Sequence, residues 1–543
     1  MLIIAFFVVF IWWIYRIYIK FTIVSPAYGG QYIEGVVKQP RFINPLLAPK
    51  SSTTDKIITK LVFSGLFDYD ENGLLRKDLV DNYEILDGGK KYLVHLKKDI
   101  KWHDGKNFSA NDVIYTINVI KSPDYTVAGV SSDMRLAWTN IKVTKEDDYT
   151  LVFELDKPRS SFLHLLTIGI LPEHIWSHVS PEQFNVDIHN LKPVGIGPYV
   201  FVDVNFDSNN FIKEYILRAY KGYHRGEPYI TKFVFRTYPD RDSILEAYIS
   251  GEILGITVDL KDKLKLLSGA TSEKLFLDLP SYYAVFFNRN KSVPLAYKEV
   301  REALNLATNK EEILESVFGN LVKRVDNTLL LGMNGYDSKY SINEYNINKA
   351  KELLDKVGYK MEGNVRKKDG NNLSFELVVR DKPGQLAEVA EKLKEQWSKI
   401  GVDVKIVKLE REDLVVNKIK PMSYDALLYS HPLRWDNPSM KKHWYSKSKE
   451  YPGLNFSHIN DDNLDKTIDA LEIELDNSKR AEYYKKIQQK IKDDSSAEFL
   501  FAPGFFFVYS DSIHNIPVKR VNASYDRFVG VEKWYINEKR IRK

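Results

Sequence analysis

The chain has 543 residues, of which 44% are hydrophobic and 28% are charged, as in a folded globular protein of about three to four domains. Its net charge of +5 is small for this length and forms no basic stripe, so the composition gives no reason to expect nucleic-acid binding. Cysteine is absent, which excludes a disulfide scaffold, thiolate catalysis and a lipid-modified N-terminal cysteine.

The N-terminal segment is strongly apolar. Residues 2–15 are all apolar or aromatic, and the run continues to Val24 past Arg16 and Lys20. A membrane-spanning helix needs about twenty such residues, and basic residues at its end can reach the interface. We therefore predict an uncleaved membrane anchor over residues 1–24, with a cleaved signal peptide or a buried helix as alternatives. The basic residues follow the run, which by the positive-inside rule favours a cytoplasmic body instead.

The segment from Asp81 to Lys121 predicts a hairpin, a turn and a capped helix. Apolar and polar residues alternate from Tyr92 to Leu96, which is the pattern of a half-buried strand. Ser109 and Asp112 fit a capping box, in which each side chain hydrogen-bonds to the other residue's backbone N–H. The apolar residues that follow recur on one helix face, so a helix is expected here.

The second half of the chain alternates between helical and strand patterns. Helices are expected at 300–307, 310–318, 386–400, 461–475 and 478–492, and a strand at 402–406. Gly401 joins the helix at 386–400 to that strand, as in a βαβ fragment of a doubly wound sheet. The body is therefore expected to be of the α/β class.

Four blocks of sequence carry a resemblance to a known family. They are WHDG followed by SANDVIYT at 102–116, PVGIGPY at 193–199, YYAVFFN with VREAL at 282–304, and AKELL with Gly-Tyr at 350–359. In this order they resemble the family 5 extracellular solute-binding proteins, the peptide- and nickel-type receptors of ABC importers. The resemblance covers roughly residues 29–535, and Ile196 stands where the second block usually has threonine.

The resemblance implies a type II periplasmic-binding fold, with two lobes around a ligand cleft, a hinge and an inserted extra domain. The expected boundaries are 28–70, 194–275 and 504–543 for lobe one, 71–193 for the inserted domain and 276–503 for lobe two. Crossings near 270–280 and 500–506 would form the hinge, because domain closure concentrates backbone rotation at a few element ends. Gly504 is either a pivot of that hinge or an ordinary loop glycine.

No enzyme or metal motif stands out. The chain has no Gly-x-Ser-x-Gly elbow, P-loop or His-Glu-x-x-His sequence. His174 and His178 are spaced to share a helix face, but no carboxylate or third histidine lies near them in sequence. His103 beside Asp104 fits a turn better than a catalytic dyad. We therefore expect no catalytic residue, no metal site and no cofactor.

The expected ligand site centres on the segment HPLRWDNP at residues 431–438. By resemblance it falls where the family places a cleft loop with an aspartate that receives a peptide amine. Asp436 is its only acid, whereas Arg434 would instead prefer a carboxylate or phosphate. Both alternatives stay open, and Trp435 could either stack on the ligand or close the core.

Four further candidates for the ligand site come from two other segments of the resemblance. Phe42 and Asn44 belong to an RFINP stretch that resembles the family's first cleft strand, and Tyr283 and Asn288 belong to the third block.

The sequence as a whole therefore predicts a monomeric receptor, tethered to the cell membrane by a single N-terminal helix, with its binding domain on the periplasmic or extracellular side. The resemblance implies that it captures oligopeptides and delivers them to an ABC permease. A receptor for a nickel chelate, a sugar or another non-peptide solute is the first alternative. A surface sensor or chaperone without transport is the second.

Overall fold

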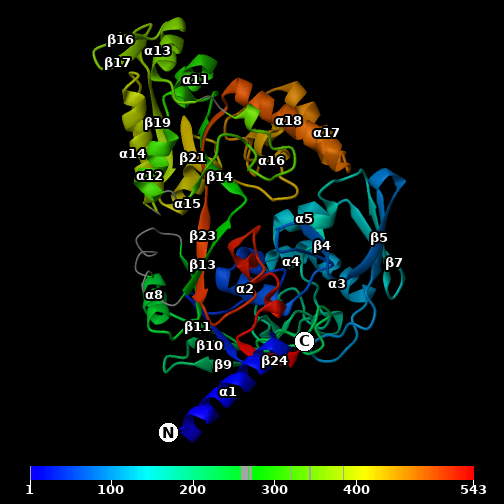
Figure 1. The fold of residues 1–543 in the computed structure, drawn as a ribbon. Coiled ribbons are helices and arrows are strands. Elements are labelled where there is room, and N and C mark those ends of the chain that lie inside the picture. Colours follow the sequence, from blue (N-terminus) through cyan, green and yellow to red (C-terminus); the bar gives the residue numbers. More distant parts are fainter. Residues whose placement is uncertain (1, 259–266, 268–271, 320, 342–343, 383) are drawn as a thin grey trace.

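The computed structural model describes residues 2–258, 267, 272–319, 321–341, 344–382 and 384–543. Two large sheets and one smaller antiparallel sheet organise this part of the chain (Figure 1). The parts of the chain built on the two larger sheets meet at an interface, and the cavities described below lie at this interface. We call the two parts built on the larger sheets lobe one and lobe two, and the part built on the smaller sheet the inserted domain.

Lobe one is built on a seven-stranded sheet with the order β13-β23-β12-β2-β11-β10-β9. Its strands are β2 (Gln31–Val36), β9 (Tyr199–Phe206), β10 (Ile212–Ala219), β11 (Lys232–Thr237), β12 (Gly255–Val258), β13 (Ser272–Asp278) and β23 (Gly504–Ser510). β2 runs parallel to β11 and β12, and the other pairs are antiparallel. Helices α2 (Thr53–Val62) and α8 (Arg241–Ile249) follow β2 and β11, and each begins at a residue whose side chain accepts a hydrogen bond from the first turn.

Lobe two is built on a six-stranded sheet with the order β15-β22-β14-β21-β19-β20. Its strands are β14 (Ser281–Phe287), β15 (Lys323–Arg324), β19 (Ser374–Arg380), β20 (Asp403–Leu409), β21 (Ala426–Pro432) and β22 (Ala497–Ala502). Its helices are α10 (Val293–Ala296), α11 (Lys298–Leu306), α12 (Lys310–Phe318), α13 (Ile347–Lys356), α14 (Gln385–Ser398), α15 (Arg411–Leu414), α16 (Lys441–Trp444), α17 (Asp462–Ile473) and α18 (Asn477–Asp494). A small sheet of β16 (Lys360–Glu362), β17 (Val365–Lys368) and β18 (Asn371–Asn372) lies at its far end (Figure 1).

The predicted βαβ fragment is confirmed. β19, α14 and β20 follow one another, and β19 pairs with β20 in parallel register. Gly401 ends the helical stretch with φ +80°, a left-handed conformation that favours glycine. β14 is buried on both faces, with Tyr282 and Phe286 in one core cluster and Val285 in the other. This explains why its sequence reads as an unbroken apolar run.

The inserted domain carries a four-stranded antiparallel sheet with the order β5-β6-β8-β7. Its strands are β5 (Val80–Leu86), β6 (Lys91–Leu96), β7 (Ile141–Asp147) and β8 (Thr150–Leu155), and its helices are α3 (Ala110–Lys121), α4 (Pro123–Val127), α5 (Ser132–Trp138), α6 (Phe162–Leu165) and α7 (Glu173–Trp176). Ser109 and Asp112 form both hydrogen bonds of the predicted capping box at the start of α3. A short hairpin of β3 (Phe67–Tyr69) and β4 (Leu75–Lys77) leads into this domain.

Two segments of chain cross side by side between the lobes. β13 leads to β14, and β22 leads through Pro503 to β23. The Leu279 N–H donates to the Pro503 carbonyl oxygen at 3.1 Å, which ties the two crossings together. A Cβ at Gly504 would collide with the ring of Phe276, so glycine is required here for close approach. In the crossing predicted near 270–280, residues 270 and 271 lie outside the described part of the chain.

The N-terminal segment differs from its prediction. A helix, α1 (Leu2–Phe21), projects from lobe one, but the chain then forms β1 (Thr22–Ala27), which pairs antiparallel with β24 (Asn537–Arg542) (Figure 1). The last residues of the predicted anchor therefore belong to a strand. Among the described residues, no helix has the length and apolarity that crossing a membrane requires. The predicted single-pass anchor over 1–24 is thus not supported; the side chains of residues 2–6, 8 and 9 lie outside the described part.

Candidate functional site

Two adjoining cavities lie where lobe two meets lobe one and the inserted domain. The small cavity, of about 540 Å³, is enclosed by α2, β3, residues 164–169, residues 522–532 and Leu433-Arg434 of lobe two. The large cavity, of about 1180 Å³, lies between β2 and the starts of α2 and α8 on one side and α14 and α15 on the other. Pro49 and Lys56 line both cavities, so the two form neighbouring parts of one cleft.

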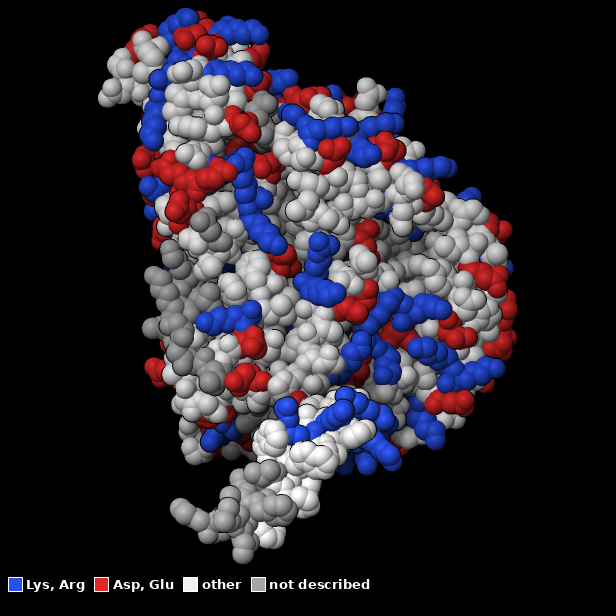
Figure 2. Space-filling view, viewed as in Figure 1, with Lys and Arg blue, Asp and Glu red and all other residues white. Residues whose placement is uncertain are grey.

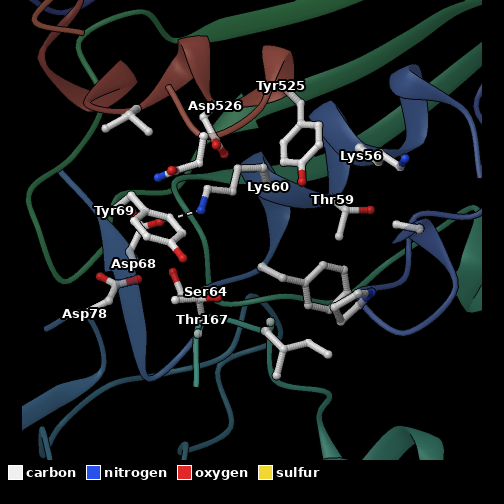
Figure 3. A pocket seen from close by; sticks show the side chains of 18 of the residues that line it. Lys56, Thr59, Lys60, Ser64, Asp68, Tyr69, Asp78, Thr167, Tyr525 and Asp526 are labelled. Carbon is white, nitrogen blue, oxygen red and sulfur yellow. Dashed lines mark hydrogen bonds and ion pairs between the residues drawn. The ribbon is translucent and has the colours of Figure 1, made fainter. Parts of the chain in front are cut away.

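A cluster of opposite charges forms one wall of the small cavity. Lys60 extends from α2 toward Asp68 on β3 (Figure 3), and the two form an ion pair. The Asp68 carboxylate also pairs with Arg76 at 3.1 Å and with Arg225 at 3.4 Å. Burial alone would raise the pKa of Asp68, but these three cations outweigh it and hold that pKa well below its usual range. Asp68 is therefore ionised at all physiological pH values.

The charge cluster extends to the C-terminal segment of lobe one. Arg225 donates to Glu532 at 2.8 Å, and Asp526 lies near Lys60 (Figure 3). The Asp526 carboxylate accepts a hydrogen bond from the Ala523 N–H at 2.9 Å. Burial, opposed by Lys60 and reinforced by Asp68, raises the pKa of Asp526 to about 6. Asp526 thus changes charge closer to neutral pH than an ordinary carboxyl group does.

The raised pKa of Asp526 predicts a specific pH dependence of stability. Its ordinary value is 3.8, so between pH 4 and 6 the folded state binds more protons than the unfolded state. Stability contributed by this group is therefore present at low pH and lost as the pH rises through about 6, by up to about 3 kcal/mol. The Asp526→Asn variant keeps the acceptor for Ala523 but cannot ionise.

We expect Asp526→Asn to be more stable than the wild type at pH 7 and closer to it at pH 4. Urea unfolding of both proteins across this range measures the difference, and other titrating groups cancel in the comparison. Stability curves that run parallel from pH 4 to 7 would contradict the assignment.

The loop at 431–438 presents Arg434, rather than Asp436, to the small cavity. The Arg434 side chain is exposed, lines the cavity and forms no ion pair within the described part of the chain. Asp436 Oδ2 instead accepts the backbone N–H of Leu75 at 3.0 Å, which joins lobe two to the β3–β4 hairpin. Burial raises the pKa of Asp436, and its Oδ1 has no hydrogen-bond partner in the structure. The structure therefore places the Arg434 side chain at the small cavity and the Asp436 carboxylate against the β3–β4 hairpin.

His164 stands beside this loop as a neutral side chain. Its Nε2 lies 3.9 Å from Asp436 Oδ2, a spacing that would suit an ion pair if the ring were protonated. Burial, together with Arg434 and Arg480, lowers the pKa of His164 to about 3. The imidazole is therefore uncharged at neutral pH, and its Nδ1 lies 3.2 Å from the Tyr69 hydroxyl.

Trp435 joins the two lobes as a buried side chain. Only 4% of it is exposed, and its indole N–H donates to the Val521 carbonyl at 3.0 Å. The Arg520 guanidinium lies 4.6 Å from its ring centre, and a Cβ at Gly73 would collide with the indole. In the structure, Trp435 therefore packs within the protein.

The other predicted ligand residues have different surroundings. Tyr283 is half-buried, lines the large cavity and stacks on Phe501 with ring centres 5.0 Å apart. Asn44 is fully buried; its side chain donates to Asn190 at 3.1 Å and accepts from the Leu46 N–H. Phe42 packs partly buried against the lobe-one core. Asn288 is buried and donates to the Met422 carbonyl. Of these four residues, Tyr283 lines a cavity.

Sequence reasoning did not find the charge cluster. Lys60, Asp68 and Asp526 come from three separate segments and carry no shared motif. The sequence contained one relevant signal, the capping box of Ser52 and Asp55, which marks where α2 begins. From that start, Lys56 and Lys60 are four residues apart and lie on the same face of the helix. Nothing local indicated that Asp68 and Asp526 would meet that face.

Two of the histidines noted in the sequence, His103 and His174, have structural partners. His103 Nδ1 accepts the Gly195 N–H, and its Nε2 lies 3.0 Å from the Gly197 carbonyl, so it connects two of the family-like blocks. His174 contacts Asp104 at 2.7 Å. Within the described residues, no group of three or more histidines, aspartates or glutamates could hold a metal ion.

Comparison with known proteins places the chain in a family. Residues 75–452 match the model of the bacterial extracellular solute-binding proteins, family 5, which is well over half of the chain. The chain belongs to this family. Its members are solute-binding receptors. In this chain the PVGIGPY block packs between α2 and His103.

Individual members of the family match most of the chain. It is 27% identical to the oligopeptide-binding protein AppA of Bacillus subtilis over 522 residues, covering 94% of this chain and 92% of AppA. It is 26% identical to the dipeptide-binding protein of Escherichia coli over 77% of this chain and 79% of that protein.

Solved structures agree in fold over the same length. Bacillus subtilis AppA in complex with a nonapeptide superposes with a TM-score of 0.71, at 25% identity over 94% of this chain and all of AppA. NikZ of Campylobacter jejuni in complex with Ni(L-His) gives 0.72, at 25% identity over 93% of this chain and 99% of NikZ. CtaP of Listeria monocytogenes superposes with a TM-score of 0.80, at 24% identity over 94% of this chain and 99% of CtaP.

Proposed function

We propose that this protein is an extracytoplasmic receptor that captures oligopeptides and delivers them to the permease of an ABC transporter. The observation that carries the proposal is the cleft itself, whose large cavity alone measures about 1180 Å³. Sites for small ligands are typically about 300–1,000 Å³, so the two adjoining cavities together suit a ligand of several residues. The nonapeptide held by the similar AppA supports the same ligand class.

A receptor for a metal chelate is the second candidate, because NikZ, which holds Ni(L-His), is as similar to this chain as AppA in its solved structure. A small chelate would fill the small cavity of about 540 Å³ and leave the large one to solvent. Cleft volume therefore favours the peptide.

We further propose that ligand capture closes the two lobes of a monomer. The moving parts are residues 28–70, 194–275 and 504–543, which carry the inserted domain at 71–193, against residues 276–503. The two tied crossings near 279 and 503 supply the narrow connection that hinge closure needs. Side chains of the protein that line the cleft, such as Lys56 of lobe one and Tyr283 of lobe two, would then contact the bound peptide at the same time.

The deciding experiment is to purify the full-length protein from its native cells and identify what it retains. Ligand released by denaturation is analysed by mass spectrometry. Peptides of several residues are the expected result. A retained metal chelate or sugar would replace the peptide with the second candidate, and peptide cleavage abolished by substituting one titratable residue would overturn the receptor function.

We also propose that the N-terminal segment holds the receptor at the membrane surface. Ile11 to Tyr15 on α1 are apolar or aromatic, and each of them is about half exposed or more. Lys and Arg side chains gather where α1 meets the body (Figure 2), including Lys539, Arg540 and Arg542 on β24. Apolar side chains beside a basic cluster favour an anionic lipid surface.

We expect the full-length protein to sediment with membranes, and Trp12→Ser/Trp13→Ser to shift it toward the supernatant. A Val127→Ser variant, which removes an exposed apolar side chain elsewhere, is the control. Equal recovery of all three proteins in the supernatant would refute membrane association through α1.

A further inference from the structure

The large cavity has an excess of positive charge. Its lining includes six basic residues, which are Lys38, Lys50, Lys56, Arg241, Arg411 and Arg527. The acids in this lining are Glu34 and Asp240, and both are engaged within the protein. Glu34 accepts from Arg527 at 2.6 Å, and Asp240 caps α8 by accepting the Ser243 N–H at 2.8 Å. The cavity therefore attracts anions.

Two of these cations face the same space from different lobes. Lys56 comes from α2 of lobe one and Arg411 from α15 of lobe two. Neither forms an ion pair or a side-chain hydrogen bond within the described part of the chain. Burial lowers the pKa of Lys56, and the positive charge of the nearby Arg411 lowers it further. Closing the lobes would strengthen that repulsion unless an anion lies between them.

A buried donor in the wall of the same cavity has no acceptor. Arg527 is 3% exposed; its Nη2 donates to Glu34 and its Nη1 to the Ser524 carbonyl, but its Nε–H has no hydrogen-bond partner. A buried unsatisfied donor on a charged group is costly, so its presence points to a missing acceptor.

Three helices also begin at this cavity. The first residues of α2, α8 and α14 line it, and α14 starts at Gly384 without a side-chain cap. The N-terminus of a helix carries a partial positive charge and free N–H groups, which favour anions. Two of these helices belong to lobe one and the third to lobe two, so the favourable field comes from both sides.

We propose that the large cavity binds an anionic oxyanion group of the ligand, held between Lys56 of lobe one and Arg411 of lobe two. The inference rests on the proposed receptor function and narrows its ligand to one with a carboxylate or phosphate at this position. In an oligopeptide the group is the C-terminal carboxylate. The anion replaces repulsion between the lobes by attraction to both, so it stabilises the closed form more than the open one.

Calorimetry on the full-length protein in detergent tests this with defined probes. The first probes are libraries of nonapeptides with uncharged side chains. Their N-terminus is either free or acetylated, and their C-terminus is either a free carboxylate or an amide. The second probe is inorganic phosphate. Lys56→Gln and Arg411→Gln are compared with Lys213→Gln, which removes an exposed, unpaired lysine from β10 of lobe one.

The wild type should bind free-acid peptides about tenfold more tightly than amides, because charge-assisted hydrogen bonds are lost in the amide. Lys56→Gln and Arg411→Gln should each remove this preference, because they weaken binding of the free acid more than binding of the amide, and Lys213→Gln should retain it. Equal binding of acid and amide by the wild type, or an undiminished preference in both variants, overturns the anion site and leaves the peptide function standing.

The phosphate arm separates the site from the peptide function. If no peptide binds but phosphate does, and Lys56→Gln and Arg411→Gln abolish phosphate binding, the anion site stands and the oligopeptide function fails. If neither peptide nor phosphate binds, both proposals are refuted.

Discussion

Asp68→Ala is expected to destabilise the protein by about 3 kcal/mol, because it leaves several partly buried cations without their shared counterion. Lys60, Arg76 and Arg225 all contact this carboxylate, and none of the three side chains is more than 26% exposed. The low pKa of Asp68 means that the loss should be nearly constant from pH 5 to 8. Asp68→Asn should be almost as damaging, since it keeps the shape and removes the charge.

Urea unfolding followed by tryptophan fluorescence measures the effect. Glu146→Ala removes an exposed acid on β7 that has no ion pair in the structure, and it should change stability by less than about 0.5 kcal/mol. A loss for Asp68→Ala as small as that of this control would show that the cluster is solvated and contributes little.

Arg434→Ala is expected to weaken binding of N-acetylated peptides by about ten- to a hundredfold and to improve binding of peptides with a free amine. The guanidinium is exposed in the small cavity and has no acidic partner in the described structure, so it can donate charge-assisted hydrogen bonds to ligand oxygens. The same positive charge disfavours a ligand ammonium. Arg434→Asp should therefore reverse the preference of the wild type.

Asp436→Ala provides the matched comparison, because it alters the same loop without changing the exposed charge. Its carboxylate accepts the Leu75 N–H between lobe two and the hairpin, so its loss should weaken both peptide forms equally, by about 1 kcal/mol. Calorimetry with free and acetylated peptides separates the cases. If Asp436→Ala selectively abolishes binding of free-amine peptides, and Arg434→Ala changes neither form by more than about 0.5 kcal/mol, Asp436 is the ligand clamp.

Local order was predictable from short stretches of sequence. The capping boxes or caps at Ser109 and Asn309 placed the starts of α3 and α12 correctly, and Gly401 correctly marked the junction of α14 and β20. These features depend on hydrogen bonds and backbone preferences over a few residues, which any sequence displays directly. The four family blocks indicated the family for the same reason, since each is a short, contiguous stretch of sequence.

The N-terminal segment shows where local reasoning fails. The apolar run reads as one anchor to Val24, yet the helix ends at Phe21 because Thr22–Ala27 pairs with the distant strand Asn537–Arg542. A strand partner at the other end of the chain supplies backbone hydrogen bonds that no local pattern could announce.

The ligand cleft is likewise a tertiary property. From the sequence alone, the charged residue of the loop at 431–438 that faces the cleft could be either Arg434 or Asp436. Trp435 could equally stack on the ligand or close the core. In the structure, Asp436 accepts a hydrogen bond from Leu75, and Trp435 packs against Val521 and Gly73. Among the described residues, Arg434 has no such contact, and it lines the cavity. Two groups of charges interact only when folding brings distant segments together and excludes water. They are Lys60, Asp68 and Asp526 in one group and Lys56 and Arg411 in the other. Desolvation and charge pairing depend on that assembly, whereas helix caps and turns do not.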